Sequence, residues 1–497
     1  MMRLVFERLA AHAASHSDKV ALVDDCGALT YRELPAVIAH AASMFKAQRV
    51  ASMIENSNTW AVVDLALAQN EAVSIPIPQF FTDGQARHLI DEAAPDLIVT
   101  DQPERVALLA GMSPTGSAEI AGRELFLFSR PATARHPLPP DTCKITYTSG
   151  TTGQPRGVCL TAQAIESVTL SLAEAADAGA GDRGLALLPL STLLENIGGI
   201  YVPLLTGSTA AVPSLASCGF TGSSMVQPEM LVAALHRYLP SAIILVPQLL
   251  KLLVECLSAG AALPSSLRFV AVGGAPCARA LIERARGLGL PVYEGYGLSE
   301  AGSVVSLNRA GAQRPGSVGR PLPHAFVHIA TDGEIVVAGR LFSGYLGGAT
   351  MPPTEWPTGD LGHFDDEGYL YVTGRKKTVF ATAFGRNVSP EWVEGELTAS
   401  AALMQAAVFG EGHARNVAVL VPHPAARPEQ IAAAVAAANA RLPDYARVAA
   451  WHRAAAPFLQ TNHLARSTGL PDREAIAHHF AEALEQLYAS EASHVDV

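Results

Sequence analysis

The feature that most constrains this chain is a repeated alternation of short, β-branched apolar runs with helical stretches. Such runs lie at residues 72–76 (AVSIP), 97–100 (LIVT), 241–246 (SAIILV) and 269–272 (FVAV), each next to a helical pattern. Strands that alternate with helices predict parallel sheets with helices on their faces. We therefore expect an α/β fold.

The texture of the sequence changes in the last third of the chain. From about residue 325 short strands and turns predominate, as in residues 333–337 (GEIVV) and 368–372 (GYLYV). Beyond Gly374 come a strand, helices and the strand-like run 417–421 (VAVLV). We expect a small twisted β region followed by a compact α+β unit. A length of 497 residues, about three times that of a typical domain, favours one large and one smaller domain.

Composition and charge exclude several classes of protein. The net charge of −11, with no basic run beyond Arg375–Lys377, argues against a nucleic-acid partner. No stretch approaches the roughly 18 apolar residues of a membrane helix, and charges near the N-terminus are unlike an export signal, so we expect a cytoplasmic protein without a transmembrane segment. The six cysteines have no disulfide or zinc-site spacing, which indicates buried thiols.

The segment that points most directly to chemistry is Tyr147–Val158 (YTSGTTGQPRGV). Its glycines and hydroxyl side chains are able to surround anionic oxygens with N–H and O–H donors, as phosphate-binding loops do. It is not a Walker A loop, which requires Gly-Lys-Ser/Thr after four spacer residues. A flexible linker would not need so many specific residue types in a row.

This segment resembles the signature loop of the adenylate-forming superfamily, which includes acyl-CoA synthetases, aryl-CoA ligases, luciferases and peptide-synthetase adenylation domains. The family loop reads Tyr-Thr-Ser-Gly-Ser/Thr-Thr-Gly-x-Pro-Lys-Gly, and Arg156 stands here at the lysine position. Arginine keeps the positive charge that contacts phosphate. The chain is closest in character to fatty acyl-CoA synthetases.

Further motifs follow in the family's order, and the resemblance implies a role for each. Gly273–Pro276 is similar to the adenine-binding turn, and Tyr293–Glu300 (YEGYGLSE) to the motif whose tyrosine stacks on adenine and whose glutamate helps to hold magnesium. Thr358–Asp360 resembles the Thr-Gly-Asp motif that binds the ribose hydroxyls. Gly374–Lys377 is similar to the interdomain hinge, and Phe384–Glu391 to a loop that lines the thiol tunnel after the small domain rotates.

The resemblance therefore implies domains at 1–373 (large, ATP- and acid-binding) and 378–497 (small and mobile), joined by a hinge at 374–377. It also implies an AMP-forming acid–thiol ligase that uses ATP, Mg²⁺ and CoA or carrier-protein phosphopantetheine. The implied catalytic residues are Thr148, Thr151, Arg156, Glu300, Lys377 and Gly385, with Glu300 and Thr151 at the metal. The implied nucleotide-binding residues are Ser149, Gly150, Thr152, Gly153, Gly274, Ala275, Pro276, Glu294, Gly295, Tyr296, Gly297, Ser299, Asp360 and Arg375.

The acyl pocket is expected near the segment Leu188–Asn196 (LPLSTLLEN), where relatives often carry an aromatic residue or histidine at the position of Thr192. The small Thr192 beside leucines suggests an apolar slot and favours a fatty acid over an amino acid. The expected pocket residues are Thr192, Leu193, Asn196, Val246 and Gly273.

One position departs from the family pattern. Family members place a lysine near the C-terminus that bridges the substrate carboxylate and the α-phosphate, and Leu470 stands at that position here. Arg466 lies four residues earlier and would substitute only if the loop brought it there. Loss of one cation from a charged transition state would cost about 2–4 kcal/mol, so adenylation is expected to be slow.

Three functions remain open from the sequence. The first is a synthetase that forms an acyl-adenylate and passes the acyl group to CoA or to an acyl carrier protein. The second uses the adenylate without a thioester. The third is a non-catalytic or partner-dependent homologue that binds nucleotide but adenylates poorly because of Leu470.

Overall fold

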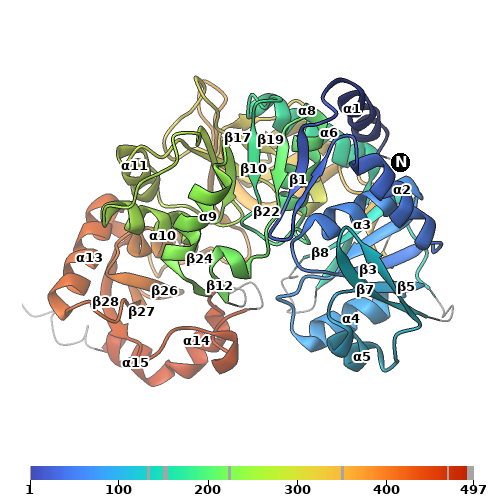
Figure 1. Ribbon diagram of the computed structural model, residues 1–497. Coiled ribbons are helices and arrows are strands. Elements are labelled where there is room, and N and C mark those ends of the chain that lie inside the picture. Colours follow the sequence, from blue (N-terminus) through green and yellow to red (C-terminus); the bar gives the residue numbers. More distant parts are fainter. Residues whose placement is uncertain are drawn as a thin grey trace, which may run out of the picture.

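The computed structural model describes residues 2–130, 135–148, 155–221, 225–348, 352–466 and 470–489. Figure 1 shows a large body formed by the N-terminal three quarters of the chain and a separate C-terminal lobe, coloured orange to red, that packs beside α10. Within these residues no helix is both long and apolar enough to span a membrane. The α/β class expected from the sequence is confirmed.

Two large sheets, counted over the described residues, form the body. The first has nine strands in the order β18-β17-β16-β15-β14-β10-β11-β1-β2, and β16 to β1 run parallel through the centre. Its strands are β1 (Val20–Val23), β2 (Ala28–Thr30), β10 (Arg183–Leu185), β11 (Thr209–Ala211), β14 (Ala242–Leu245), β15 (Phe269–Val272), β16 (Val292–Tyr296), β17 (Ser306–Leu307) and β18 (Arg320–Pro321).

The second sheet has eight strands in the described chain, in the order β21-β9-β8-β4-β3-β5-β7-β6. They are β3 (Arg49–Met53), β4 (Val73–Pro76), β5 (Leu97–Thr100), β6 (Gly116–Ile120), β7 (Arg123–Ser129), β8 (Thr142–Thr148), β9 (Arg156–Thr161) and β21 (Gly344–Tyr345). The strands expected at 72–76, 97–100, 241–246 and 269–272 are thus present. A large apolar core joins elements of both sheets.

Helices cover these sheets, and side-chain caps begin several of them. Ser57 accepts a hydrogen bond from the Trp60 N–H at the start of α3, and Thr82 forms a capping box with Gln85 on α4. The helices of the body are α1 (Arg3–Ser15), α2 (Leu34–Met44), α3 (Asn58–Gln69), α4 (Asp83–Ala93), α5 (Pro103–Ala110), α6 (Ala162–Ala175), α7 (Leu193–Asn196), α8 (Val202–Thr206), α9 (Pro228–Tyr238), α10 (Pro247–Ser258) and α11 (Arg279–Gly287), with a π-helix at Ile197–Tyr201.

A smaller four-stranded sheet follows, as the change of texture near residue 325 predicts. It comprises β19 (Ala325–Ile329), β20 (Glu334–Gly339), β22 (Glu355–Phe364) and β23 (Leu370–Arg375), all antiparallel. Two-stranded ribbons are formed by β12 (Phe220–Thr221) with β13 (Met225–Val226) and by β24 (Phe380–Ala381) with β25 (Asn387–Val388).

The C-terminal lobe has two apolar clusters of its own, drawn from residues between Phe380 and Tyr488. It contains β26 (Leu403–Phe409), β27 (Asn416–Pro422), β28 (Val448–Arg453), α12 (Pro390–Thr398), α13 (Pro428–Arg441), α14 (Arg473–His479) and α15 (Ala481–Ala489). One contact between lobe and body is polar: Lys251 on α10 donates to the main-chain carbonyl of Leu403. Burial lowers the pKa of Lys251 to about 8.

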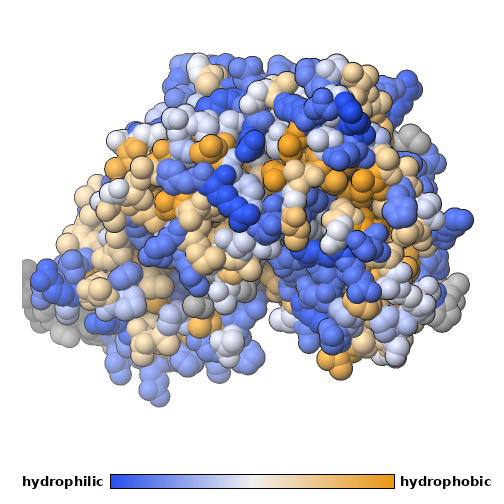
Figure 2. Space-filling view, in the orientation of Figure 1, coloured by the Kyte–Doolittle hydropathy of each residue, from blue (hydrophilic) through white to orange (hydrophobic). Residues whose placement is uncertain are grey.

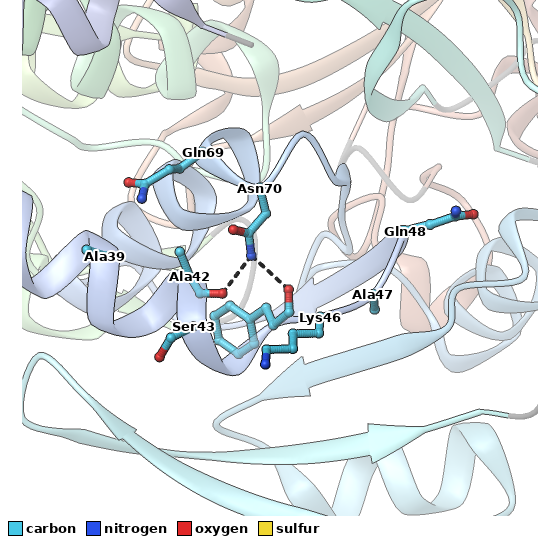
Figure 3. Close-up of a pocket in the computed structure, with 9 residues that line it drawn as sticks. Ala39, Ala42, Ser43, Lys46, Ala47, Gln48, Gln69 and Asn70 are labelled. Carbon is cyan, nitrogen blue, oxygen red and sulfur yellow. Dashed lines mark hydrogen bonds between the residues drawn. The ribbon is translucent and has the colours of Figure 1, made fainter.

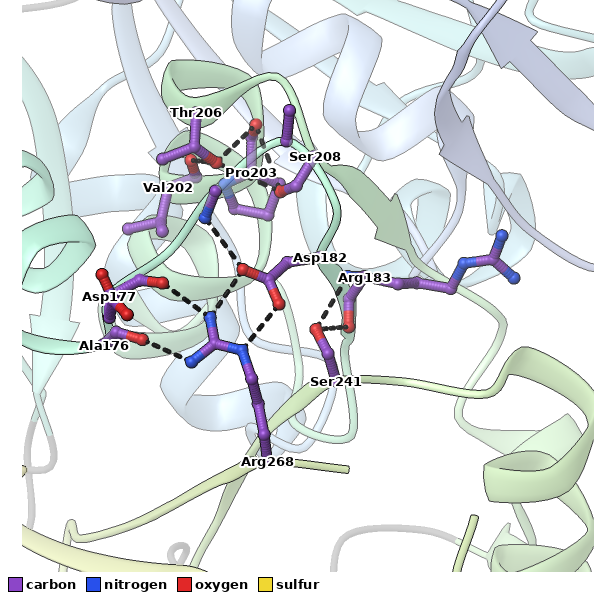
Figure 4. Close-up of polar contacts among 12 residues, drawn as sticks. Ala176, Asp177, Asp182, Arg183, Val202, Pro203, Thr206, Ser208, Ser241 and Arg268 are labelled. Carbon is purple, nitrogen blue, oxygen red and sulfur yellow. Dashed lines mark hydrogen bonds and ion pairs between the residues drawn. The ribbon is translucent and has the colours of Figure 1, made fainter. Parts of the chain in front are cut away.

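Two polar features of the body are structural supports. Arg268 donates to both carboxylate oxygens of Asp182 (2.8 and 2.6 Å) and to the carbonyls of Ala176 and Asp177 (Figure 4). These contacts tie the end of α6 to the residues just before β10 and β15. The Asn70 side chain donates to the carbonyls that end α2, beside a small surface hollow (Figure 3).

Candidate active site

A large cavity lies between the body and the C-terminal lobe, and most motif residues reach it. Figure 2 shows the surface hollowed between these two parts. The sequence-predicted residues that line the cavity are Thr148, Arg156, Thr192, Val246, Gly274, Ala275, Pro276, Glu294, Gly295, Tyr296, Gly297, Ser299, Glu300, Asp360, Arg375 and Lys377. Segments more than 200 residues apart in sequence therefore share one site.

Strand ends explain this convergence. β15 and β16 are parallel neighbours, and the Gly273–Pro276 turn follows β15 directly while Gly297 follows β16. Ligands of open α/β sheets bind outside the carboxyl ends of such strands. A Cβ atom at Gly297 would lie 1.7 Å from the carbonyl oxygen of Ser303, so the tight turn into Glu300 admits only glycine.

Asp360 is the centre of one polar group in the cavity. Its carboxylate is buried, with 5% exposure, and accepts hydrogen bonds from the Tyr296 hydroxyl (2.7 Å) and from Nε of Arg375 (2.7 Å). A carboxylate has about four lone-pair sites, so each oxygen keeps acceptor capacity. The two carboxylate oxygens of Asp360 are therefore able to accept hydrogen bonds from two further hydroxyl groups.

Glu300 belongs to a second polar group. The Tyr345 hydroxyl donates to Oε1 of Glu300 (2.6 Å), and the guanidinium of Arg156 lies 3.6 Å from the centre of the Tyr345 ring. Tyr345 is a cavity residue that the sequence interpretation missed. It arrives by the pairing of β21 with β9, which no local sequence signal reveals.

The central part of the signature loop, Ser149, Gly150, Thr151, Thr152 and Gly153, lies outside the described residues. Thr148 ends β8 and Arg156 begins β9, so these two residues fix the points where the loop leaves and rejoins the sheet. Both line the cavity.

The donor set suits Mg²⁺ bound together with a nucleotide. The described residues contain no cluster of three or more His, Cys, Asp or Glu side chains that would hold a metal alone. Mg²⁺, however, is usually bound by one or two carboxylates together with substrate phosphates. Glu300, a carboxylate in the cavity beside Arg156 and the signature loop, fits that mode.

Two of the five expected acyl-pocket residues line the cavity. Thr192 and Val246 line the cavity with Leu188 and Leu194, but Leu193 is buried in the main apolar core. Successive residues of a helix point about 100° apart, so Leu193 and its neighbour Leu194 face different surroundings.

Asn196 is also buried, and its amide belongs to a buried polar cluster. It donates to Asp64 (3.1 Å) and accepts from Nζ of Lys144 (2.5 Å). Lys144 also bonds both Asp64 oxygens and the Tyr201 hydroxyl. A Cβ atom at Gly273 would lie 3.1 Å from the Gly295 carbonyl oxygen, and Gly273 is not among the described residues that line the cavity.

The C-terminal lobe brings some of its expected functional residues to the cavity and leaves Gly385 outside it. Lys377, Arg466 and Leu470 line the cavity. Among the described lining residues Gly385 is absent; it occupies a turn with φ of 69° next to Phe384, which is 75% exposed. The lobe thus turns the Leu470 loop, and not the Gly385 loop, toward the nucleotide motifs.

The burial of Glu294 predicts that the stability of the folded protein depends on pH. Burial raises the pKa of Glu294 to about 8, with Arg286 opposing the shift, whereas the ordinary value is 4.5. The folded protein therefore binds this proton more tightly than the unfolded chain, and stability falls as pH rises from 4.5 to about 8.

Glu294→Gln has no ionisable carboxyl group at this position, so the variant should not lose stability in this pH interval. We expect the unfolding free energy of the variant, relative to the parent, to increase by up to about 1.4 kcal/mol per pH unit across this interval. Urea unfolding at several pH values measures it, with Glu104→Gln on the surface of α5 as the matched control. Parallel pH profiles for Glu294→Gln and the parent would contradict the assignment.

Comparisons with known proteins agree with this geometry. The chain matches the AMP-binding enzyme family over residues 9–346 and the AMP-binding enzyme C-terminal domain over residues 377–492. It is 28% identical over 435 residues to a long-chain-fatty-acid–CoA ligase of Mycobacterium bovis, covering 71% of this chain and 69% of the relative. It is 30% identical over 400 residues to a 2-succinylbenzoate–CoA ligase of Bacillus cereus, covering 73% of this chain and 75% of that relative.

A solved structure shows the same fold. The crystal structure of an anthranilate CoA ligase in complex with anthranoyl-AMP superposes with a TM-score of 0.80 at 17% identity, covering 96% of this chain and 98% of that chain. At this identity the likeness concerns the arrangement of the chain, which includes both the body and the C-terminal lobe.

Proposed function

Because this chain belongs to the AMP-binding enzyme family, we propose that it is an AMP-forming acid–CoA ligase that activates an apolar carboxylic acid as an acyl-adenylate. The observation that carries the proposal is the convergence on one cavity of Asp360 with its two donors, Glu300, and the ends of the signature loop. A nucleotide and an acid would meet there.

The described residues fit the first half-reaction. A carboxylate oxygen of the acid attacks the α-phosphorus of ATP, and the bond to the bridging oxygen breaks with release of pyrophosphate. In this proposal Asp360 accepts hydrogen bonds from the ribose hydroxyls, Tyr296 stacks on adenine, and Arg156 contacts phosphate. Their contribution is to position the nucleotide and to offset charge.

Magnesium bound with the nucleotide would neutralise phosphate charge, and Glu300 is the described carboxylate proposed to hold it, with Thr151 of the signature loop as a second proposed ligand. The acyl group would then pass from AMP to a thiol after the C-terminal lobe rotates about Lys377. In that second step Gly385 and its loop are proposed to reach the site. We propose CoA as the thiol, as in the named relatives.

The acid is proposed to be a fatty acid. Leu188, Leu194, Val246 and Leu249 form an apolar part of the cavity wall, and Thr192 leaves room beside them. The named relatives act on both long-chain fatty and aromatic acids, so chain length and ring tolerance are the properties to measure.

The test is mass spectrometry of reactions that contain ATP, Mg²⁺ and a panel of fatty and aromatic acids, with and without CoA. Acyl-adenylate that converts to acyl-CoA is the expected result, with C8–C16 fatty acids converted faster than benzoates. Adenylate that CoA does not consume would point instead to a carrier-protein phosphopantetheine. Absence of any adenylate despite ATP binding would sink the proposal.

A second candidate is a nucleotide-binding homologue that adenylates only with a partner. The observation in its favour is that Leu470, a side chain without charge, lines the cavity where the family pattern places a lysine. The same panel separates the two candidates, since a partner-dependent homologue would make no adenylate alone.

A further inference from the structure

Adenylation brings two anions together, so the cavity must supply a cation on the side that faces them. Two unit charges 4 Å apart at an effective dielectric constant near 20 repel by about 4 kcal/mol. Leu470 offers no charge to offset that repulsion. Another cation would therefore have to reach the two anions in place of Leu470.

Most cations of the described cavity wall are held by close carboxylates. Four on the hinge side and the C-terminal lobe pair at 2.6–2.7 Å: Arg375 with Asp360, Lys376 with Asp332, Arg441 with Glu396, and Arg473 with Glu394. Arg156 stacks on Tyr345 at the far side, next to the signature loop. Arg279 pairs with Glu283 at 2.7 Å and Arg105 with Asp83 at 3.2 Å. Among the described lysines and arginines of the cavity wall, Lys377 and Arg466 are therefore the loosely engaged cations.

Arg466 lies next to Leu470 in the fold. The Arg466 N–H donates to the Leu470 carbonyl (2.8 Å), and Ala465 pairs with Pro471 as an antiparallel bridge. The two residues are therefore hydrogen-bonded neighbours, although four positions separate them in sequence. The three residues between them lie outside the described part of the chain.

The Arg466 side chain is also available for a ligand. Its Nε lies 3.8 Å from Oδ2 of Asp472, near the outer limit of an ion pair, and the side chain is 46% exposed. Asp472 is itself occupied as the cap of α14, where Oδ1 accepts from the Ala475 N–H. A guanidinium presents a planar fork that matches carboxylate and phosphate oxygens.

We propose that Arg466 is a catalytic residue that contacts the α-phosphate and the substrate carboxylate, in place of the cation that Leu470 lacks. This inference rests on the proposed adenylation. In that step the O–P bond to the acid forms as the P–O bond to pyrophosphate breaks. No proton is transferred in this step, and the guanidinium of Arg466 supplies positive charge and N–H donors.

The experiment compares the full-length protein with Arg466→Gln, Arg466→Lys and the double variant Arg466→Gln/Leu470→Lys. We expect Arg466→Gln to slow acyl-adenylate formation about 100-fold. Arg466→Lys should keep part of the rate, and the double variant should recover it. Thioester formation from supplied acyl-adenylate and CoA should change less than about twofold, since the lobe that carries Arg466 is proposed to rotate before that step.

A binding measurement keeps the proposal testable without turnover. Calorimetry should show AMP bound about tenfold more weakly by Arg466→Gln, while adenosine, which has no phosphate, binds unchanged. Arg453→Gln, an exposed arginine at the end of β28, is the control and should match the parent in every assay.

The outcomes separate this inference from the proposed function. If the parent makes no adenylate, the proposed function fails, and the AMP measurement still decides the role of Arg466. If the parent adenylates and Arg466→Gln matches it in rate and in AMP affinity, the inference is overturned. A loss found with Lys377→Gln and not with Arg466→Gln would assign the cation to the hinge.

Discussion

Asp360→Ala is expected to lower kcat/KM for ATP about a thousandfold. The buried carboxylate already orients Tyr296 and Arg375, and in the proposed complex it also accepts two ribose hydroxyls. Hydrogen bonds to a charged group are worth about 1.5–3 kcal/mol each, so loss of two corresponds to roughly 10²–10⁴ in kcat/KM. Steady-state kinetics at saturating acid with varied ATP gives this value directly.

Two further variants test whether the loss of kcat/KM in Asp360→Ala comes from the hydrogen bonds of this carboxylate. Tyr296→Phe removes only the hydroxyl that bonds Asp360 and should cost about tenfold, since a single hydrogen bond to the carboxylate is lost. Asp366→Ala, an exposed aspartate on the turn before β23, should behave as the parent. An unchanged KM for ATP in Asp360→Ala would show that the ribose lies elsewhere.

Asp64→Ala is expected to destabilise the body by about 3–5 kcal/mol. The side chains of Asp64 and Lys144 are only 3% and 5% exposed, and their atoms lie 2.8 and 3.0 Å apart. Without the carboxylate, the ammonium would stay buried with only Asn196 and Tyr201 as partners. Urea unfolding followed by tryptophan fluorescence measures the change.

A paired substitution distinguishes a broken ion pair from a simple cavity. Asp64→Asn combined with Lys144→Met removes both charges and nearly keeps the volume, so most of the lost stability should return. If Asp64→Ala alone cost less than about 1 kcal/mol, Lys144 would have to be neutral or hydrated in the folded protein.

Local patterns made much of this fold predictable. The β-branched runs at 97–100 and 269–272 are strands because their residue types and flanking helices fit a buried parallel sheet at any position in the chain. The motif residues around Glu300 and Asp360 were also identifiable, because turns after strands require particular residues at short spacing.

The residues that the sequence did not place depend on helix phase or on distant pairing. Leu193 and Asn196 lie where a one-turn helix runs into the π-helix Ile197–Tyr201, and the wider turn changes which side chains face the core. Tyr345 reaches Glu300 through strand β21, whose partner β9 is about 185 residues earlier. Spacing alone does not encode such a register.

If the lobe rotates as proposed, the contact of Lys251 with the carbonyl of Leu403 would couple that movement to the proton concentration. In this arrangement burial lowers the pKa of Lys251 to about 8, while a lysine released into water has its ordinary value of 10.5. A rotation that frees Lys251 would therefore take up protons between pH 8 and 10.5, and by linkage alkaline conditions favour the arrangement seen here. The proposed two half-reactions would then differ in their response to alkaline pH although neither transfers a proton to Lys251.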